Sequence, residues 1–278
     1  MSTAPRASFA VDGVAFWAPT LPGWSHARAA FRDEAAPLVT AAKRPAPELL
    51  AAAERRRAPD TVALALEVAA AAVRASGRDA AALPSVFTST HGDLAVSDYM
   101  CATLASAPTL ISPTKFHNSV HNAAAGYWTI ATGCREASTA LTAFDASFGA
   151  GLLEAASQCC ADDREVLLVA FDVEASGALA TVVASQGLLA CALVLAPGAG
   201  TNSIATIDWE LASGPAVAPA LRSAAARSLA GNAMSGALPL LEAIALAEGG
   251  DASIGLPLAP SLALRVTAHA LVAAEVPT

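Results

Sequence analysis

Apolar residues follow two patterns along the chain: short uncharged runs, and longer segments with helical spacing. The short runs are typical of buried strands, and the longer segments predict amphipathic or buried helices. Because the two kinds alternate, we expect an α/β protein with a mostly parallel central sheet. Strands are expected at residues 10–16, 84–88, 137–144, 164–171, 188–195, 204–211 and 262–273. Helices are expected at residues 26–31, 62–76, 94–105, 146–156, 215–227 and 235–247.

One stretch, residues 112–156, combines the features of a site. An uncharged run at 137–144 predicts a strand, Asp145 follows at once, and a helix rich in small residues comes next. A strand, a sharp turn and a closely packed helix form a nucleophile elbow, which presents its turn residue beside free backbone N–H groups. An enzyme places Cys or Ser at such a turn. Asp145 is expected to cap the helix as an ionised carboxylate, which does not form an acyl thioester.

Two motifs resemble those of a known family. Residues 122–126, Asn-Ala-Ala-Ala-Gly, are similar to the Asn–small–Ala-Ala-Gly motif of the β-ketoacyl synthases of the thiolase-like superfamily. Gly133 and Arg135 match the glycine and arginine that follow this motif. Residues 227–232, Arg-Ser-Leu-Ala-Gly-Asn, resemble the family's Lys-Ser-x-x-Gly-His.

This resemblance implies that the family's catalytic groups are replaced or missing. An ungapped count from the first motif places the nucleophilic cysteine at Asp145, and the second motif has Asn232 in place of its catalytic histidine and Arg227 in place of its lysine. The second histidine motif, Glu-Ala-His-Gly-Thr-Gly-Thr, has no counterpart. We therefore expect no catalytic residue in this chain.

The resemblance also refines the fold to a thiolase-like α-β-α-β-α layered arrangement with a truncated second half. We expect a ketosynthase-like N-terminal half at residues 1–200 and a shortened C-terminal half at 201–278, packed as one unit. Only a short segment separates the strand that ends near residue 195 from Arg227, where full-length ketosynthases carry a long insert.

Composition narrows the functional classes. Hydrophobic residues make up 55% of the chain and charged residues 14%, which suits a large core. The net charge of −8 makes nucleic acid an improbable partner and predicts that an acidic acyl carrier is repelled by this chain alone. Neither a phosphate-binding loop nor a dinucleotide fingerprint occurs, so no nucleotide is implied, and the resemblance implies no metal or organic cofactor.

Five cysteines without Cys-x-x-Cys spacing indicate reduced, buried thiols and a cytoplasmic protein. The longest uncharged run, 175–207, is broken by Ser185-Gln186-Gly187 and by Pro197-Gly198. It therefore predicts two strand-like segments and no membrane span.

Histidines in the central region are candidate catalytic groups or metal ligands. His91, His117 and His121 have Ser119 and Ser147 as nucleophile candidates by residue type only. Neither a Gly-x-Ser-x-Gly motif nor a suitably spaced Asp completes a triad. A metal site would need His117, His121 and Asp145 together. The residues between the two histidines do not require a helix, so we expect structural or interface histidines and no metal.

Three functional hypotheses remain open. The first is a catalytically inactive ketosynthase-like subunit, similar to the chain-length factors of aryl-polyene and xanthomonadin-type pigment systems. Its resemblance implies a heterodimer with an active β-ketoacyl-carrier-protein synthase, whose acyl tunnel it shapes, and an indirect role for acyl carrier protein. The second is a decarboxylase or acyltransferase that uses Asp145 as base. The third is a non-catalytic acyl-binding homodimer.

In the family that this chain resembles, the loop before the Asn-Ala-Ala-Ala-Gly helix reaches the partner's acyl pocket. The corresponding loop leads to Asn122 and offers apolar groups for a channel and polar groups for anchoring. The interface and tunnel residues expected here are Phe116, His117, Asn118, Ser119, Val120, His121 and Asn122.

Overall fold

The computed structural model describes residues 7–34, 40–246 and 252–271. Eight strands form one sheet in the order β3-β2-β4-β5-β1-β6-β8-β7. The strands are β1 (Ala7–Trp17), β2 (Ser85–Thr88), β3 (Ser138–Leu141), β4 (Val166–Asp172), β5 (Leu189–Ala196), β6 (Ala205–Ser213), β7 (Ala252–Ala259) and β8 (Leu262–Ala270). The α-helices are α1 (Trp24–Phe31), α2 (Ala52–Arg57), α3 (Asp60–Ser76), α4 (Leu94–Ser106), α5 (Pro113–His117), α6 (Ala123–Thr132), α7 (Ser147–Asp162), α8 (Ala224–Ser228) and α9 (Leu238–Leu246).

The direction of the strands corrects one expectation. Only β2 runs parallel to its neighbours β3 and β4, whereas the other pairings in the sheet are antiparallel. The expected mostly parallel sheet is therefore wrong. The connection from β4 to β5 is consistent with this arrangement, because it contains only the 3₁₀ helix η4 (Gly177–Thr181), whereas a crossover between parallel neighbours usually contains an α-helix.

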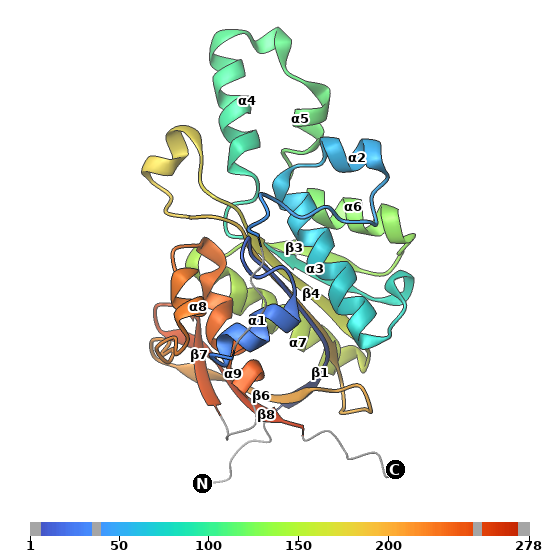
Figure 1. Cartoon of the computed structure of the whole chain (residues 1–278), viewed down its shortest axis with the longest axis vertical. Coiled ribbons are helices and arrows are strands. Elements are labelled where there is room, and N and C mark those ends of the chain that lie inside the picture. The colour runs from blue at the N-terminus through green and yellow to red at the C-terminus, as the bar shows by residue number, and fades with distance from the viewer. Residues whose placement is uncertain (1–6, 35–39, 247–251, 272–278) are drawn as a thin grey trace.

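Helices cover both faces of the sheet (Figure 1). One core joins α3 and α6 to β1, β4 and β5. The other core joins α1, α7 and α9 to the opposite face of the sheet, including the C-terminal strands β6, β7 and β8. Helix α7 contacts β2 and β4 as well as β7, so it lies between the strands of the N-terminal part and the edge strand of the C-terminal part.

Two helix predictions need correction. The expected helix at 215–227 is an irregular segment that ends in the short α8. Pro215 and Pro219 interrupt this segment, and its Val217 carbonyl accepts a hydrogen bond from the Gly255 amide of β7 at 2.9 Å. The expected helix at 235–247 begins as the 3₁₀ helix η5 (Ala233–Ala237) and continues as α9, while residue 247 lies outside the described residues.

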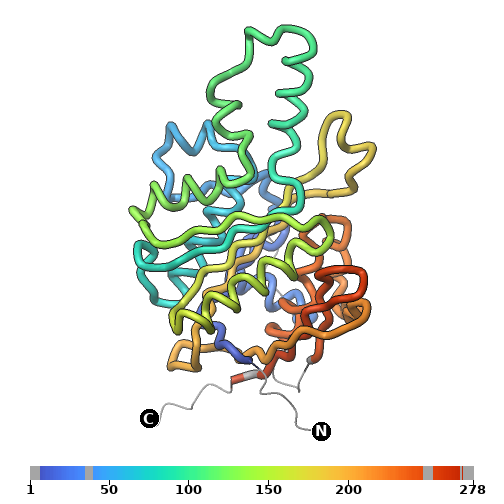
Figure 2. The backbone as a smooth tube through the Cα atoms, turned by 180° about the vertical axis from the view of Figure 1, so that it is seen from behind, coloured from blue at the N-terminus to red at the C-terminus, as the bar shows by residue number. Residues whose placement is uncertain are grey.

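Helices α4 and α5 stand out from the body as an arm, which we define as residues 94–117 (Figures 1 and 2). Only Leu94 and Val96 at the root of α4 are buried, and the 3₁₀ turn η2 (Pro108–Leu110) joins the two helices at the tip. In the described part of the chain, no helix has the length and apolar composition needed to cross a membrane.

Candidate functional site

The turn between β3 and α7 has the strained geometry of a nucleophile elbow. It contains the 3₁₀ helix η3 (Phe144–Ala146), and Phe144 adopts a φ of 49°, a left-handed conformation that is unfavourable for a bulky residue. The Ser147 hydroxyl accepts from the Ala143 amide at 2.9 Å and donates to the Phe144 carbonyl at 2.7 Å. Ser147 is buried and closes the turn, so it is no free nucleophile.

The residues presented at this turn are Phe144 and Asp145. The Phe144 side chain is 75% exposed, and Asp145 is exposed as well. The expected helix cap by Asp145 is wrong, because Ala146 is the N-cap residue and no side chain there bonds to the helix start. Within the described residues, Asp145 makes no hydrogen bond or ion pair. The strained residue thus precedes Asp145 by one position, and neither side chain supplies a thiol or hydroxyl.

Close packing fixes the first turns of α7. A Cβ atom on Gly151 would lie 2.7 Å from Thr88 Cγ2, and one on Gly149 would lie 2.5 Å from the Pro257 carbonyl oxygen. The Thr88 hydroxyl also donates to the Ser147 carbonyl at 2.9 Å. The helix can therefore approach β2 and β7 only because these two positions lack side chains.

Asn232 is a buried structural bridge. Its side-chain amide nitrogen donates to the carbonyl oxygens of Gln186 at 3.0 Å, Gly187 at 3.2 Å and Asp172 at 3.3 Å. Its side-chain oxygen accepts from the Met234 amide at 2.9 Å. Both ends of the amide are occupied by backbone groups, so this side chain is not free to polarise a substrate carbonyl.

Arg227 is exposed in the last turn of α8. Its guanidinium donates to the carbonyl oxygens of Leu221, at 3.1 Å, and of Arg222. The cation therefore closes the loop that precedes its own helix. The structure places Arg227 and Asn232 on neighbouring short elements, and each has a structural role there.

Sequence reasoning missed Asp172, a buried carboxylate at the end of β4. Its oxygens accept from the Ser89 hydroxyl at 2.7 Å and from the amides of Thr90 at 2.9 Å and His91 at 3.4 Å. Burial raises the pKa of Asp172, while these donors act in the opposite direction. An Asp that directly ends a run of buried apolar residues was the available signal, and its effect is to hold the loop that leads into the arm.

The predicted tunnel loop is partly helical. Phe116 and His117 lie in the last turn of α5, where the Phe116 ring is 63% exposed and the His117 ring meets the edge of Tyr127. Asn118 is buried and accepts from the Tyr127 hydroxyl at 3.2 Å. Val120 is 53% exposed.

The polar members of this loop hold its shape. The Ser119 hydroxyl donates to the Phe116 carbonyl at 2.8 Å, and His121 Nε2 lies 3.1 Å from the Ser89 carbonyl. Asn122 is the exposed N-cap residue of α6, without a side-chain hydrogen bond to that helix. No group of three or more potential metal ligands occurs among the described residues, and His117 is turned toward Tyr127.

A second loop is locked to the arm. The Asp98 carboxylate of α4 accepts from the Ala178 amide at 3.2 Å, within the 3₁₀ helix η4 (Gly177–Thr181). A Cβ atom on Gly177 would lie 2.0 Å from Asp98 Oδ1, and Gly177 also has a φ of 63°. The arm and the η4 loop therefore leave the body side by side (Figure 2).

A pocket of about 580 Å³ lies between the base of the arm and the end of α2. Arg44 in its wall is paired with Asp60 at 3.0 Å, but no ion pair joins the other four cations to a described residue. The net charge of the whole chain is negative, but the cations that line this pocket outnumber its carboxylates, so the local charge is positive. The cations that line this pocket, called the cationic pocket below, are Lys43, Arg44, Arg56, Arg57 and Lys115.

A shallow groove runs beside the free edge of the sheet. Strand β3 is the edge strand, and its residues Ser138 and Ala140 line the groove together with Ala125, Gly126 and Thr129 of α6. The unpaired backbone groups of an edge strand are a template for pairing with another chain. The groove and the arm lie close together, because α5 of the arm leads directly into α6, which lines the groove.

Comparisons with known proteins agree with this geometry. Residues 24–245 match the family model of the β-ketoacyl synthase N-terminal domain. The comparison with curated protein sequences found no match.

Solved structures share the fold. A chain of the ketosynthase ApeO in complex with its chain length factor ApeC, from Xenorhabdus doucetiae, is 23% identical, with a TM-score of 0.71 over 94% of this chain and 100% of that chain. A chain of the ishigamide ketosynthase/chain length factor is 17% identical, with a TM-score of 0.72 over 96% of this chain and 100% of that chain. These neighbours confirm the expected thiolase-like ketosynthase fold, and the match to the family model shows that the chain belongs to the β-ketoacyl synthase family.

Proposed function

We propose that this chain is a catalytically inactive chain-length factor, which pairs with an active ketosynthase and shapes the tunnel for its growing acyl chain. The observation that carries the proposal is the preserved elbow without a nucleophile. The turn keeps its strain at Phe144 and its brace at Ser147, yet the presented side chains are an aromatic ring and a carboxylate. A condensing enzyme needs a thiolate at this place.

The two positions that the family uses for catalysis support the same conclusion. Asn232 has its amide fully engaged with backbone groups, and Arg227 is bound to carbonyl oxygens of its own loop. Such side chains stabilise the fold and leave no group to polarise a thioester carbonyl. The elbow therefore contributes to the shape of the proposed acyl tunnel and has no catalytic role.

The arm and the edge strand β3 offer an exposed surface to a partner. The arm exposes the apolar side chains of Leu104, Leu110 and Phe116, and the loop that follows it exposes Val120. Exposed apolar patches of this kind mark interaction sites. Two structural neighbours are chains of ketosynthase/chain length factor assemblies, which supports an active ketosynthase as the partner.

The cationic pocket supports a direct role for acyl carrier protein. Lys43, Arg56 and Arg57 line it without ion-pair partners among the described residues, and Lys115 lies over the Tyr99 ring at 5.8 Å from its centroid, so four exposed cations can face an acidic surface. A third neighbour, 12% identical with a TM-score of 0.71, is a chain of the AntDE:AntF complex, in which a type II polyketide acyl-carrier protein binds its ketosynthase. We infer a conjugated polyene, as in aryl-polyene pigments, as the carrier-bound product.

Co-purification tests the proposal. The chain is expected to form a stable heterodimer with a ketosynthase that has Cys-His-His, and to gain no mass after incubation with acyl- or malonyl-carrier protein. Asp145→Cys is expected to remain inactive, because both histidines are still absent. A stable acyl adduct that Asp145→Ala abolishes would support the alternative of a decarboxylase or acyltransferase. A monodisperse homodimer that ignores ketosynthases would support the non-catalytic acyl-binding alternative.

A further inference from the structure

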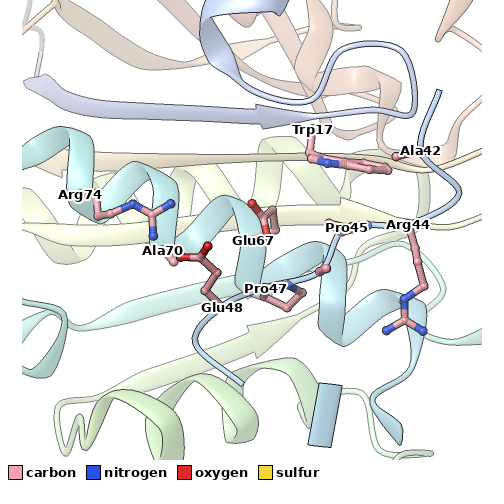
Figure 3. A pocket seen from close by; sticks show the side chains of 10 residues that line it. Trp17, Ala42, Arg44, Pro45, Pro47, Glu48, Glu67, Ala70 and Arg74 are labelled. Carbon is pink, nitrogen blue, oxygen red and sulfur yellow. The ribbon is translucent and has the colours of Figure 1, made fainter. Parts of the chain in front are cut away.

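A pocket of about 350 Å³ separates α3 from the segment that crosses it, residues 40–50, which we call the strap (Figure 3). Trp17 of β1 forms part of its wall, and the strap contributes Pro45 and Pro47. Two carboxylates of like charge lie in the same pocket, Glu67 on α3 and Glu48 on the strap. The pocket thus places an acidic pair between a helix and the segment that covers it.

Glu67 has an unusual position on α3. Its neighbours at 61–66 and 68–69 are all buried, and the Glu67 side chain itself is half-buried. It makes no hydrogen bond or ion pair with a described residue. The charged groups that line its pocket are Glu48 and Arg44 from the strap and Arg74 from α3.

Burial favours a proton on Glu67 when the strap is closed. Burial raises the pKa of Glu67, Arg74 lowers it, and Glu48 raises it further. With the strap open, water reaches the carboxylate, and its pKa returns toward the ordinary value of 4.5. Because the closed form binds this proton more tightly, closure is favoured below that value and is progressively lost as the pH rises through the pKa of the closed form.

The strap also holds helix α2. Its Ala42 amide donates to the Pro19 carbonyl at 3.0 Å, and Leu50 is buried in the core. Arg44 pairs with Asp60 and donates to the carbonyl oxygens of Arg55 at 3.3 Å and Ala58 at 3.2 Å. Arg44 lines both this pocket and the cationic pocket, so a movement of the strap reaches the arginines of α2.

We propose that the strap is a pH-responsive latch, in which ionisation of the half-buried Glu67 beneath it loosens residues 40–50 and releases the hold of Arg44 on α2. Closure sets the arginines of α2 in place around the cationic pocket, and loosening lets them move. This consequence for carrier docking rests on the proposed function, whereas the latch itself does not.

Hydrogen exchange followed by mass spectrometry tests the latch in the full chain, with rates corrected for the intrinsic effect of pH. Amide protection in residues 40–58 is compared at two pH values, one near the ordinary value of 4.5 and one well above it, and is expected to fall at the higher one, by up to about tenfold for each unit over which Glu67 titrates. Glu67→Gln is expected to keep the low-pH protection at both values, and Glu48→Gln to reduce the change. Glu54→Gln, an exposed substitution on α2, should behave as wild type.

Equal pH dependence in wild type and Glu67→Gln would overturn the latch, and so would constant protection in the wild type. Binding of acyl carrier protein to the heterodimer provides a separate readout, with affinity that declines over the same range only when Glu67 is present. If exchange shows the latch but no carrier binds, the carrier-docking part of the proposed function fails while the latch stands.

Discussion

The hydroxyl of Ser147 donates to the carbonyl oxygen of Phe144 at 2.7 Å, across the turn that joins β3 to α7. The same hydroxyl accepts from the Ala143 amide, so one buried side chain bridges both sides of the strained residue. A left-handed conformation at a non-glycine residue persists only where its surroundings enforce it. This bridge is therefore the local device that keeps the elbow in shape.

Ser147→Ala should destabilise the protein. It leaves the part-buried Ala143 amide without its acceptor, and an unsatisfied group costs up to about 1–3 kcal/mol when it is fully buried. Urea unfolding monitored by circular dichroism measures the change. Ser119→Ala serves as the matched control, because the Ser119 hydroxyl bonds to the residue three positions earlier in the same way but is exposed. An unchanged midpoint for Ser147→Ala would contradict the bridge.

Phe144→Gly should be more stable than Phe144→Ala by about 1 kcal/mol. Alanine keeps the left-handed strain, whereas glycine relieves about 1–2 kcal/mol of it at a smaller entropic cost. Either substitution loses little packing, since the ring is exposed. Thermal unfolding of the two variants side by side tests this order. The reverse order would mean that Phe144 is not strained in solution.

Strands buried on both faces were visible in the sequence, because β4 and β5 are continuous apolar runs. Strand β7 was missed, since Gly255 and Pro257 both disfavour strands. The structure holds β7 at the sheet edge through its pairing with β8. The direction of the strands was not predictable, because apolar runs indicate which strands are buried but not whether neighbouring strands are parallel or antiparallel.

The elbow was predictable in kind but not in detail. The sequence shows a predicted strand, a turn and a helix rich in small residues in succession, and this order located the turn near Asp145. The left-handed conformation of Phe144 could not be predicted from the sequence, because an aromatic residue gives no local signal for a positive φ. The cationic pocket was also invisible, since Lys43, Arg56 and Lys115 are distant in sequence and only the fold brings them together.

Thiol labelling should separate the neighbouring cysteines of α7. Cys160 is exposed, whereas burial raises the pKa of Cys159 to about 12. Only the thiolate reacts, so Cys159 should resist alkylation near neutral pH in the folded protein. Cys101 and Cys160 should be modified first, and Cys191, whose pKa burial also raises to about 12, should react only after unfolding. Peptide mass spectrometry after iodoacetamide treatment identifies the labelled sites, and early modification of Cys159 would contradict its burial.

Product length should respond to substitutions in the predicted tunnel loop. Val120→Trp adds bulk where a longer acyl chain would extend, and overfilling a packed site typically costs about 1–3 kcal/mol. At about 1.4 kcal/mol per tenfold, longer products should decline by roughly one to two orders of magnitude while the heterodimer persists. Phe116→Ala removes a ring and should lengthen or broaden the distribution. Chromatography of extracted polyenes, normalised to the amount of intact complex, measures both effects.

Because these side chains are exposed, the tunnel test can separate an effect on product length from an effect on stability. Phe116 and Val120 lie largely outside this chain's own core, so neither change should lower the stability of the isolated subunit. Val217→Trp is the matched control, because Val217 is also exposed but lies beside β7, away from the arm. If Val120→Trp and Val217→Trp reduce yield alike and leave the length profile fixed, the loop does not line the tunnel. A shortened profile with Val120→Trp alone would place the side chain at position 120 against the acyl chain, because added bulk can select for length only where it meets the end of the product.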